Sequence, residues 1–419
     1  MAVITISSNT NLTSAEVSRI SAAARSAGAT AHAVRYATLA MTAYLRGDNV
    51  LMQQPKGWRV PMSTRVVPVD YVRVRAGEEA ASVVDSGQVL MGSNSARIRD
   101  ARAGDVVSLR DSRNAVHRFT VGMIIPESFA QGDDLIMSAP AGALLGVTGV
   151  SRMEIVGFSR PDDVLSALRA RGLALGSTYR VRRSWDPPNP DGTLGLATMK
   201  LMLGEFAFRP TNSAAITIED AWRMSSISWL HRYSAIPLRN NCHRKVVDAL
   251  EGAFGEIVAA GLAGRIDVRV SQRYGGCHVA RYNRLAGMFG SPSRHAFGAA
   301  IDLNTVTNAQ GARPQMDCRI VRIFRRWGFA WGGNFWPADG MHFEWVGERR
   351  DTFGFPSRYC PNNVPVPTTS VPTGTPGTGT STTSTTTTTS TTVDPNTTGT
   401  SSTSSTSSTS SSSSSSTTP

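Results

Sequence analysis

The sequence predicts an α+β protein in which a small antiparallel sheet with flanking helices is preceded by a β-rich domain and followed by a disordered Ser/Thr-rich tail. Apolar residues recur at helical spacing over 246–258 and then alternate over 266–270, as in a helix followed by a half-buried strand. Short β-branched runs separated by turn residues occupy 64–160. Residues 361–419 contain almost no apolar side chains, so nothing offsets the entropy of ordering them.

The length of 419 residues exceeds what a single hydrophobic core usually accommodates. We predict a helical N-terminal segment at 1–60, a β-rich domain of unknown role at 61–160, a linker with a short helix at 161–214, an α+β domain at 215–360 and a tail at 361–419. The tail composition is typical of wall-spanning or O-glycosylated linkers, and a solubilising tail is the alternative.

The N-terminal half contains local start and stop signals. Thr13-Ser-Ala-Glu16 matches a capping box, and the Ala-rich run after it predicts a helix to about Leu45. Strands are predicted for the runs at 66–69, 71–74, 105–109 and 119–125. We find no paired carboxylates, nucleophile constellation or phosphate loop there, so a scaffold, binding or interaction role is expected.

Further along the chain, two helices and a loop are predicted. Residues 162–172 fit a short helix that ends at its glycine. The segment 185–192 is rich in Pro, Asn, Asp and Gly, which predicts a loop or linker. Residues 318–327 fit an amphipathic helix with a basic exposed side.

The charge balance favours an anionic partner. Lys and Arg number 43 against 31 Asp and Glu, which gives a formal net charge of +12. Nucleic acid, anionic cell-wall polymers and acidic lipids all qualify on charge alone. No RRM, helix-turn-helix or zinc-finger pattern is present, so nucleic acid is not predicted, and a cell-wall polymer stays open.

The cysteines and the N-terminus point to different compartments. Cys242, Cys277, Cys318 and Cys360 form no C-x-x-C pair, and an even number in one domain predicts two disulfides, with buried free thiols as the alternative. All three pairings stay open. An extracellular or wall-associated location is therefore expected. However, residues 1–8 show no signal-peptide pattern, and no apolar run is long enough to span a bilayer, which leaves the export route open.

Two short segments, 293–302 and 339–344, carry the candidate chemistry. His295, Asp302 and His342 offer two imidazoles and a carboxylate, a set that binds Zn²⁺ with one position open for water. Asp339, three residues before His342, is the candidate general base, and Glu344 is the alternative. Alternation along 341–345 is expected to place His342 and Glu344 on one face of a strand.

Four motifs occur in order along the chain: Tyr274-Gly-Gly-Cys277-His-Val-Ala-Arg281, Ser293-x-His295-x-x-Gly298-x-Ala300-x-Asp302, Gly328-Phe-Ala-Trp331-Gly-Gly and Asp339-Gly-Met-His342-Phe-Glu344. Together they resemble the M15 zinc peptidases, the D-alanyl-D-alanine carboxypeptidases and L-alanyl-D-glutamate endopeptidases that cleave peptidoglycan stem peptides. The resemblance covers about residues 240–348.

The resemblance implies roles for individual residues. It matches His295, Asp302 and His342 to the metal ligands, Asp339 to the general base, and Arg281 to a cation that stabilises the developing oxyanion.

Other residues near the motifs receive weaker assignments. Ser293 is expected to hydrogen-bond substrate or the turn itself. Trp331 and Trp336 are candidates to line a substrate groove, with core packing expected for at least one of them. His278 is expected to be structural. A zinc-containing wall-binding protein without catalysis is the alternative to a peptidase, and the motifs do not separate carboxypeptidase from endopeptidase.

Overall fold

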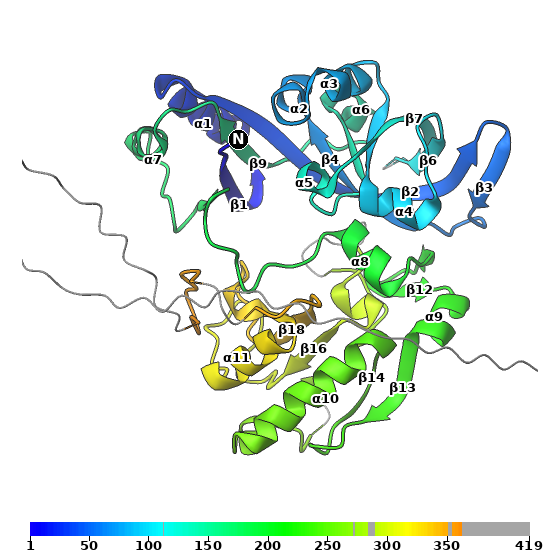
Figure 1. Cartoon of the computed structure of the whole chain (residues 1–419), viewed down its shortest axis with the longest axis vertical. Coiled ribbons are helices and arrows are strands. Elements are labelled where there is room, and N and C mark those ends of the chain that lie inside the picture. Colours follow the sequence, from blue (N-terminus) through cyan, green and yellow to red (C-terminus); the bar gives the residue numbers. More distant parts are fainter. Residues whose placement is uncertain (112, 271–272, 284–289, 351–353, 363–419) are drawn as a thin grey trace, which may run out of the picture. The chain divides into compact units, whose positions relative to one another are not determined.

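The computed structural model describes residues 1–111, 113–270, 273–283, 290–350 and 354–362 (Figure 1). Helices and sheets are mixed throughout this part of the chain, as predicted. The predicted disordered tail lies, from residue 363 onward, outside the described residues. Within the described ranges, no helix is both long enough and apolar enough to cross a bilayer.

An antiparallel sheet brings together the beginning and end of the N-terminal half, with strand order β10–β1–β9–β2. The elements follow a split β-α-β pattern, in which β1-α1-β2 and β9-α7-β10 are two similar halves. Their bounds are β1 Ile4–Leu12, α1 Ser14–Ser26, β2 Thr30–Arg46, β9 Val150–Val156, α7 Pro161–Ala170 and β10 Arg180–Arg183.

A closed six-stranded barrel is formed by β2 and strands inserted between β2 and β9. The pairing runs β2–β4–β8–β5–β7–β6 and returns to β2, so the ring has no free edge. Buried apolar side chains such as Met62, Val89 and Leu109 fill this region. The other barrel strands are β4 Val60–Val67, β5 Val89–Gly92, β6 Val106–Arg110, β7 Val116–Ile125 and β8 Leu135–Ser138. β3, Asn49–Gln53, pairs with β2 outside the ring. The helices are α2 Val69–Ala76, α3 Glu78–Asp85, α4 Ser93–Arg99, α5 Glu127–Ala130 and α6 Ala139–Leu144.

The prediction of a helix to about Leu45 is wrong beyond Ser26. The capping box is present, since Thr13 Oγ1 accepts from the Glu16 backbone N–H at 3.3 Å and the Thr13 backbone N–H donates to the Glu16 carboxylate at 2.7 Å. Gly28, at φ 68°, then reverses the chain, and β2 begins at Thr30. β2 pairs with β9, β4, β6 and β3, and these ladders outweigh the helix propensity of its alanines.

Two short strand predictions are also wrong. Residues 71–74 lie in helix α2, whose buried Tyr71 and Val72 pack against the neighbouring apolar cluster. Residues 266–270 form no strand, because the Asp267 backbone N–H donates to the side chain of Asn304 at 2.8 Å rather than to a sheet partner. The predicted helices at 162–172, 246–258 and 318–327 are confirmed as α7, α10 and α11.

The C-terminal half contains a four-stranded antiparallel sheet with order β15–β16–β18–β17. α10 (Arg244–Ala259) and α11 (Cys318–Arg326) belong to the same half as this sheet (Figure 1). Their buried residues share one apolar core with Ile301 and Phe343 of the sheet. The strands are β15 Tyr274–Gly275, β16 Ala300–Leu303, β17 Phe329–Trp331 and β18 His342–Trp345. The other elements are α8 Leu196–Leu203, β11 Phe208–Pro210, β12 Ile216–Ile218, α9 Asp220–Ser226, β13 Ile227–Arg232 and β14 Arg239–His243.

Two disulfides tie this half together, as predicted. Cys242 is bonded to Cys277, and Cys318 is bonded to Cys360. The first joins β14 to the segment after β15, and the second joins the start of α11 to the end of the described chain. Each link restricts the unfolded chain and thereby stabilises the sheet that carries the candidate site.

Candidate metal centre

The register of β16 and β18 places Asp302 directly opposite His342, and Ala300 opposite Glu344. Directly paired side chains on one face of an antiparallel sheet lie about 5 Å apart at Cβ, so the pairing itself brings the two candidate ligands together. The neighbouring Ile301 and Phe343 point into the core on the other face. The alternation predicted for 341–345 is therefore confirmed.

A tight turn of 3₁₀ helix, Arg294–Phe297, supplies His295. Ser293 caps this turn, because its Oγ accepts a hydrogen bond from the Ala296 backbone N–H at 3.2 Å. Gly298 closes the turn at φ 65°, and a Cβ there would lie 2.8 Å from the backbone nitrogen of His243. Only glycine satisfies both demands, so this position returns the chain into β16 close behind His295.

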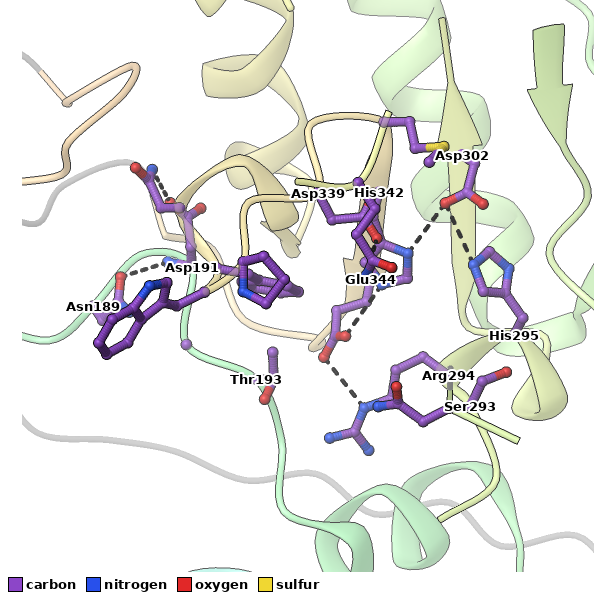
Figure 2. Close-up of a pocket in the computed structure, with 18 of the residues that line it drawn as sticks. Asn189, Asp191, Thr193, Ser293, Arg294, His295, Asp302, Asp339, His342 and Glu344 are labelled. Carbon is purple, nitrogen blue, oxygen red and sulfur yellow. Dashed lines mark hydrogen bonds and ion pairs between the residues drawn. The ribbon is translucent and has the colours of Figure 1, made fainter. Parts of the chain in front are cut away.

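The three candidate ligands converge at one point (Figure 2). The ligand atoms of His295, Asp302 and His342 lie within 4.8 Å of one another. Asp302 Oδ1 is 3.4 Å from His295 Nε2 and 3.1 Å from His342 Nδ1. The two rings meet edge to face, with centroids 5.1 Å apart. Two imidazoles and one carboxylate are the donor set of hydrolytic zinc sites that keep an open position.

His295 shows that this set fits a cation. Its Nδ1 lies 3.3 Å from the Gly276 carbonyl, which can only accept, so Nδ1 carries a proton and Nε2 is the ring atom that would bind a metal ion. Nε2 is buried and has no hydrogen-bond partner among the described residues. Buried polar atoms are nearly always satisfied, and a metal ion held with Asp302 and His342 would satisfy this one.

The pKa shifts of Asp302 and His342 also show that the cluster stabilises positive charge. Burial opposes ionisation of Asp302, but the imidazoles of His295 and His342 hold the pKa of its carboxyl well below its usual range. Burial likewise opposes charge on His342, yet hydrogen bonds with Asp302 and Glu344 raise the pKa of this imidazole to about 10. The buried carboxylate of Glu344 and the half-buried carboxylate of Asp302 thus stabilise a cation here, which is a proton when no metal is bound.

A cavity of about 420 Å³ opens over the cluster. All three candidate ligands line it, as do Asp339, Arg281, Ser293, Arg294, Glu344, Gln310, Arg180, Asn189, Asp191, Gly192, Thr193, Asn283, Asn334, Phe335, Trp336, Pro337 and Met341. Every residue predicted for catalysis or metal binding therefore faces one space.

The Asp339 turn is held tightly against the cluster. Gln310 Nε2 donates to Asp339 Oδ2 at 3.2 Å, and the His342 backbone N–H donates to the Asp339 carbonyl at 3.1 Å. Gly332 lies beneath this turn, where a Cβ would come within 2.5 Å of the Asp339 carbonyl oxygen and 3.0 Å of His342 Cβ. The Gly-Gly of the Trp331 motif therefore allows the close approach of the two segments.

The prediction that Trp331 lines a substrate groove is wrong. Trp331 is 1% exposed, packs in the apolar core and donates its indole N–H to the Gly340 carbonyl at 2.9 Å. Trp331 pairs with Phe343 across the sheet, and both side chains lie on the core face rather than on the face of the candidate ligands. Trp336 lines the cavity instead. His278 lies outside the lining residues, with Nδ1 3.1 Å from the Ala296 carbonyl.

The segment predicted as a linker supplies part of the cavity wall. Asp191 is buried and accepts from Arg325 Nε at 2.9 Å and from Arg325 Nη2 at 2.6 Å. It also accepts from the Trp331 backbone N–H at 3.1 Å and from Asn334 Nδ2 at 2.8 Å. These bonds fix residues 189–193 beside the site (Figure 2). No local pattern marks this aspartate, because its partners lie 134 residues or more away in sequence.

Comparison with known proteins agrees with this geometry. A family model of M15 peptidases, described as D-alanyl-D-alanine carboxypeptidase, matches residues 289–345. The matched segment contains His295, Asp302, Asp339 and His342. No curated protein gives a significant match to the chain. The segment that builds the metal centre thus matches the M15 peptidase family, as its motifs predict.

Proposed function

We propose that this protein is a zinc-dependent peptidase that hydrolyses the peptide stems of peptidoglycan. The observation that carries the proposal is the convergence of His295, Asp302 and His342 within 4.8 Å, in a segment that matches a peptidase family. These three residues would hold Zn²⁺, which when bound lowers the pKa of a water molecule and polarises a carbonyl.

Asp339 is proposed as the general base. Its carboxylate lines the cavity and is oriented by the Gln310 amide, so it is placed to take a proton from the attacking water and pass it to the leaving amine. Glu344 is less suited to this role, because its oxygens lie 3.3 Å from His342 Nε2 and 3.5 Å from Arg294 Nε. These contacts support a role for Glu344 in orienting His342.

Arg281 is proposed to stabilise the oxyanion that forms on the scissile carbonyl. It lines the same cavity, and its carbonyl accepts a hydrogen bond from the Ser293 backbone N–H at 3.0 Å. This bond ties the backbone at Arg281 to the turn that carries His295. A fixed cation at this position acts where negative charge develops.

The cell wall is the proposed place of action. Two disulfides support an oxidising compartment outside the cytoplasm, and the net charge of +12 supports contact with anionic wall polymers. A wall-binding protein that holds zinc without turnover is the alternative.

Digestion of purified peptidoglycan with mass analysis, with and without a chelator, tests the proposal. Release of D-alanine alone identifies a carboxypeptidase, and a cut between L-alanine and D-glutamate identifies an endopeptidase. Bound zinc without any chelator-sensitive product supports the binding alternative.

The role of Asp339 is tested by Asp339→Asn, with Asp163→Asn, an exposed carboxylate-to-amide change outside the cavity, as the matched control. Asp339→Asn is expected to keep stoichiometric zinc and lose about 10³-fold in turnover, because general acid–base catalysis contributes on that order. Loss of zinc from Asp339→Asn, measured by elemental analysis, would make Asp339 a ligand or a structural residue.

A further inference from the structure

The cavity at the metal centre shares lining residues with two other cavities beside strand β10. Arg180 lines all three: the metal-centre cavity, a neighbouring cavity of about 920 Å³, and one of about 500 Å³ on the N-terminal sheet. The guanidinium of Arg180 lies 5.4 Å from the Trp336 ring, and that of Arg182 lies 4.9 Å from the Phe355 ring. Through these stacked pairs, β10 forms a wall shared by the peptidase site and the N-terminal sheet.

The cavity on the N-terminal sheet, here called the arginine cavity, is strongly cationic. Its lining includes five arginines, several hydroxyl groups and, among the described residues, one carboxylate, Glu154. That carboxylate is already neutralised, because Arg152 Nη2 and the Tyr71 hydroxyl each lie 2.5 Å from it. The arginines are Arg75, Arg152, Arg180, Arg182 and Arg183, and the hydroxyl-bearing residues are Thr5, Ser7, Tyr36, Ser151 and Ser184.

Three of these arginines each have a buried nitrogen that no protein group satisfies among the described residues. Arg75 Nε, Arg152 Nε and Arg182 Nη1 are each buried, and within the described ranges none has a hydrogen-bond partner. A buried charged donor left unpaired is costly, and three donors around one cavity make an anion the natural partner. Arg152 is also held in place, since its guanidinium lies 4.7 Å from the Tyr36 ring. Guanidinium groups fixed in this way match the two oxygens of a carboxylate.

We propose that the arginine cavity binds carboxylate groups of the peptidoglycan whose stems the metal centre cleaves. The inference rests on the proposed function, because it assigns both sites to one polymer. Peptidoglycan presents many stem peptides with free carboxylates. One part of the polymer held in the arginine cavity raises the effective concentration of a neighbouring stem at the metal centre. The N-terminal half thereby becomes a substrate-binding module rather than a passive scaffold.

The binding test uses the full chain carrying Asp339→Asn, so that the substrate stays intact during co-sedimentation with purified sacculi. Addition of Arg75→Gln and Arg182→Gln is expected to weaken binding about tenfold at low salt, since two charge-assisted contacts are lost. The matched control carries Arg25→Gln and Arg169→Gln on α1 and α7, two exposed positions outside the arginine cavity, and is expected to bind within about twofold of the parent. Equal binding by the two double variants would overturn the proposal.

Chemically altered sacculi identify the anion. If carboxylates are the ligand, amidating them removes the difference between the two double variants, while stripping phosphate-containing polymers leaves it unchanged. The reverse pattern would overturn the carboxylate assignment in favour of a phosphate polymer. If the double variant Arg75→Gln with Arg182→Gln, here called the cavity variant, has a lower thermal unfolding midpoint than the parent, the single variant Arg75→Gln is used in its place.

Kinetics with the active protein link this binding to catalysis. In the otherwise native chain, the cavity variant is expected to lose about tenfold more kcat/KM on sacculi than on a free stem peptide, because only the polymer reaches both sites. Arginine-dependent binding without any hydrolysis by the native protein would remove the proposed function and leave the anion site. Hydrolysis with equal losses on both substrates would remove the inference and leave the peptidase.

Discussion

The protein buries two charged clusters, one around Asp134 and one at the candidate metal centre, and the clusters differ in what satisfies them. In the N-terminal half, Asp134 is fully buried, and protein groups meet its carboxylate on every side that is described. Lys200 Nζ and Ser95 Oγ lie 2.7 Å away, and Ser63 donates through its backbone N–H at 2.8 Å and its hydroxyl at 3.0 Å. We call this cluster closed in the sense that protein groups satisfy both oxygens of the Asp134 carboxylate.

At the candidate metal centre, by contrast, one buried polar atom has no protein partner among the described residues. His295 Nε2 is buried without a hydrogen-bond partner among the described residues, and its neighbours Asp302 and His342 face a cavity. The direction of a pKa shift does not separate the two clusters. Despite burial, Lys200 lowers the pKa of Asp134, just as the imidazoles lower that of Asp302. Buried charge alone is therefore no sign of function, whereas a buried polar atom without a partner beside a cavity is.

The largest expected effect is the loss of a metal ligand. His342→Ala removes one of three donors, so zinc is expected to be lost and kcat/KM to fall by about 10³-fold or more. Zinc content and stem-peptide hydrolysis measure the two effects. Full zinc occupancy in His342→Ala would show that the cluster is not the metal site.

The closed cluster should respond in stability instead. Asp134→Ala leaves Lys200 with reduced compensation in a fully buried position, and is expected to lower the free energy of unfolding by about 3–5 kcal/mol. Urea denaturation measures this change. Asp163→Ala, which breaks an exposed pair with Arg160, is the control and is expected to cost under about 1 kcal/mol. Similar losses in both variants would end the contrast between the clusters.

Zinc itself should stabilise the native protein. A ligand that binds only the folded state at about 100 times its Kd adds about 2.7 kcal/mol. The thermal unfolding midpoint is expected to rise with zinc and fall with chelator in the native chain and in Asp163→Ala, but not in His342→Ala. A rise in His342→Ala would place the stabilising zinc elsewhere.

The smallest expected effect concerns acid stability. Burial and the nearby charge of Arg223 lower the pKa of His278 to about 4, from an ordinary value of 6.5. Since the unfolded chain binds the proton first, the contribution is complete above pH 6.5 and is lost as the pH falls towards 4. The free energy of unfolding is expected to fall by about 1–2 kcal/mol in total between pH 6.5 and 4, because His278 is only partly buried.

Urea denaturation of the metal-free protein at several pH values checks this decrease. His278→Gln does not titrate, so its stability should fall less between pH 6.5 and 4 than that of the native chain. Parallel profiles for the two proteins would show that His278 does not contribute.

Local sequence patterns predicted the site better than the fold around it. The turn at His295 and the strand at 341–345 are set by near neighbours, through a Ser cap, a glycine at positive φ and alternating burial. The strand β2 was mistaken for a helix because its alanines favour helix when neighbouring strands are ignored. Asp191 was assigned to a linker because its partner Arg325 is remote in the chain.

The sequence by itself identified the candidate metal ligands, the general-base candidate and the presence of two disulfides, because spacing and residue chemistry within short motifs carry that information. Only the tertiary structure decided that the barrel closes, that Trp331 is buried while Trp336 lines the cavity, and that Arg180 of β10 lines both the metal-centre cavity and the arginine cavity. These features depend on pairings between distant segments. Their free energy comes from sheet ladders and from buried contacts that no local window contains.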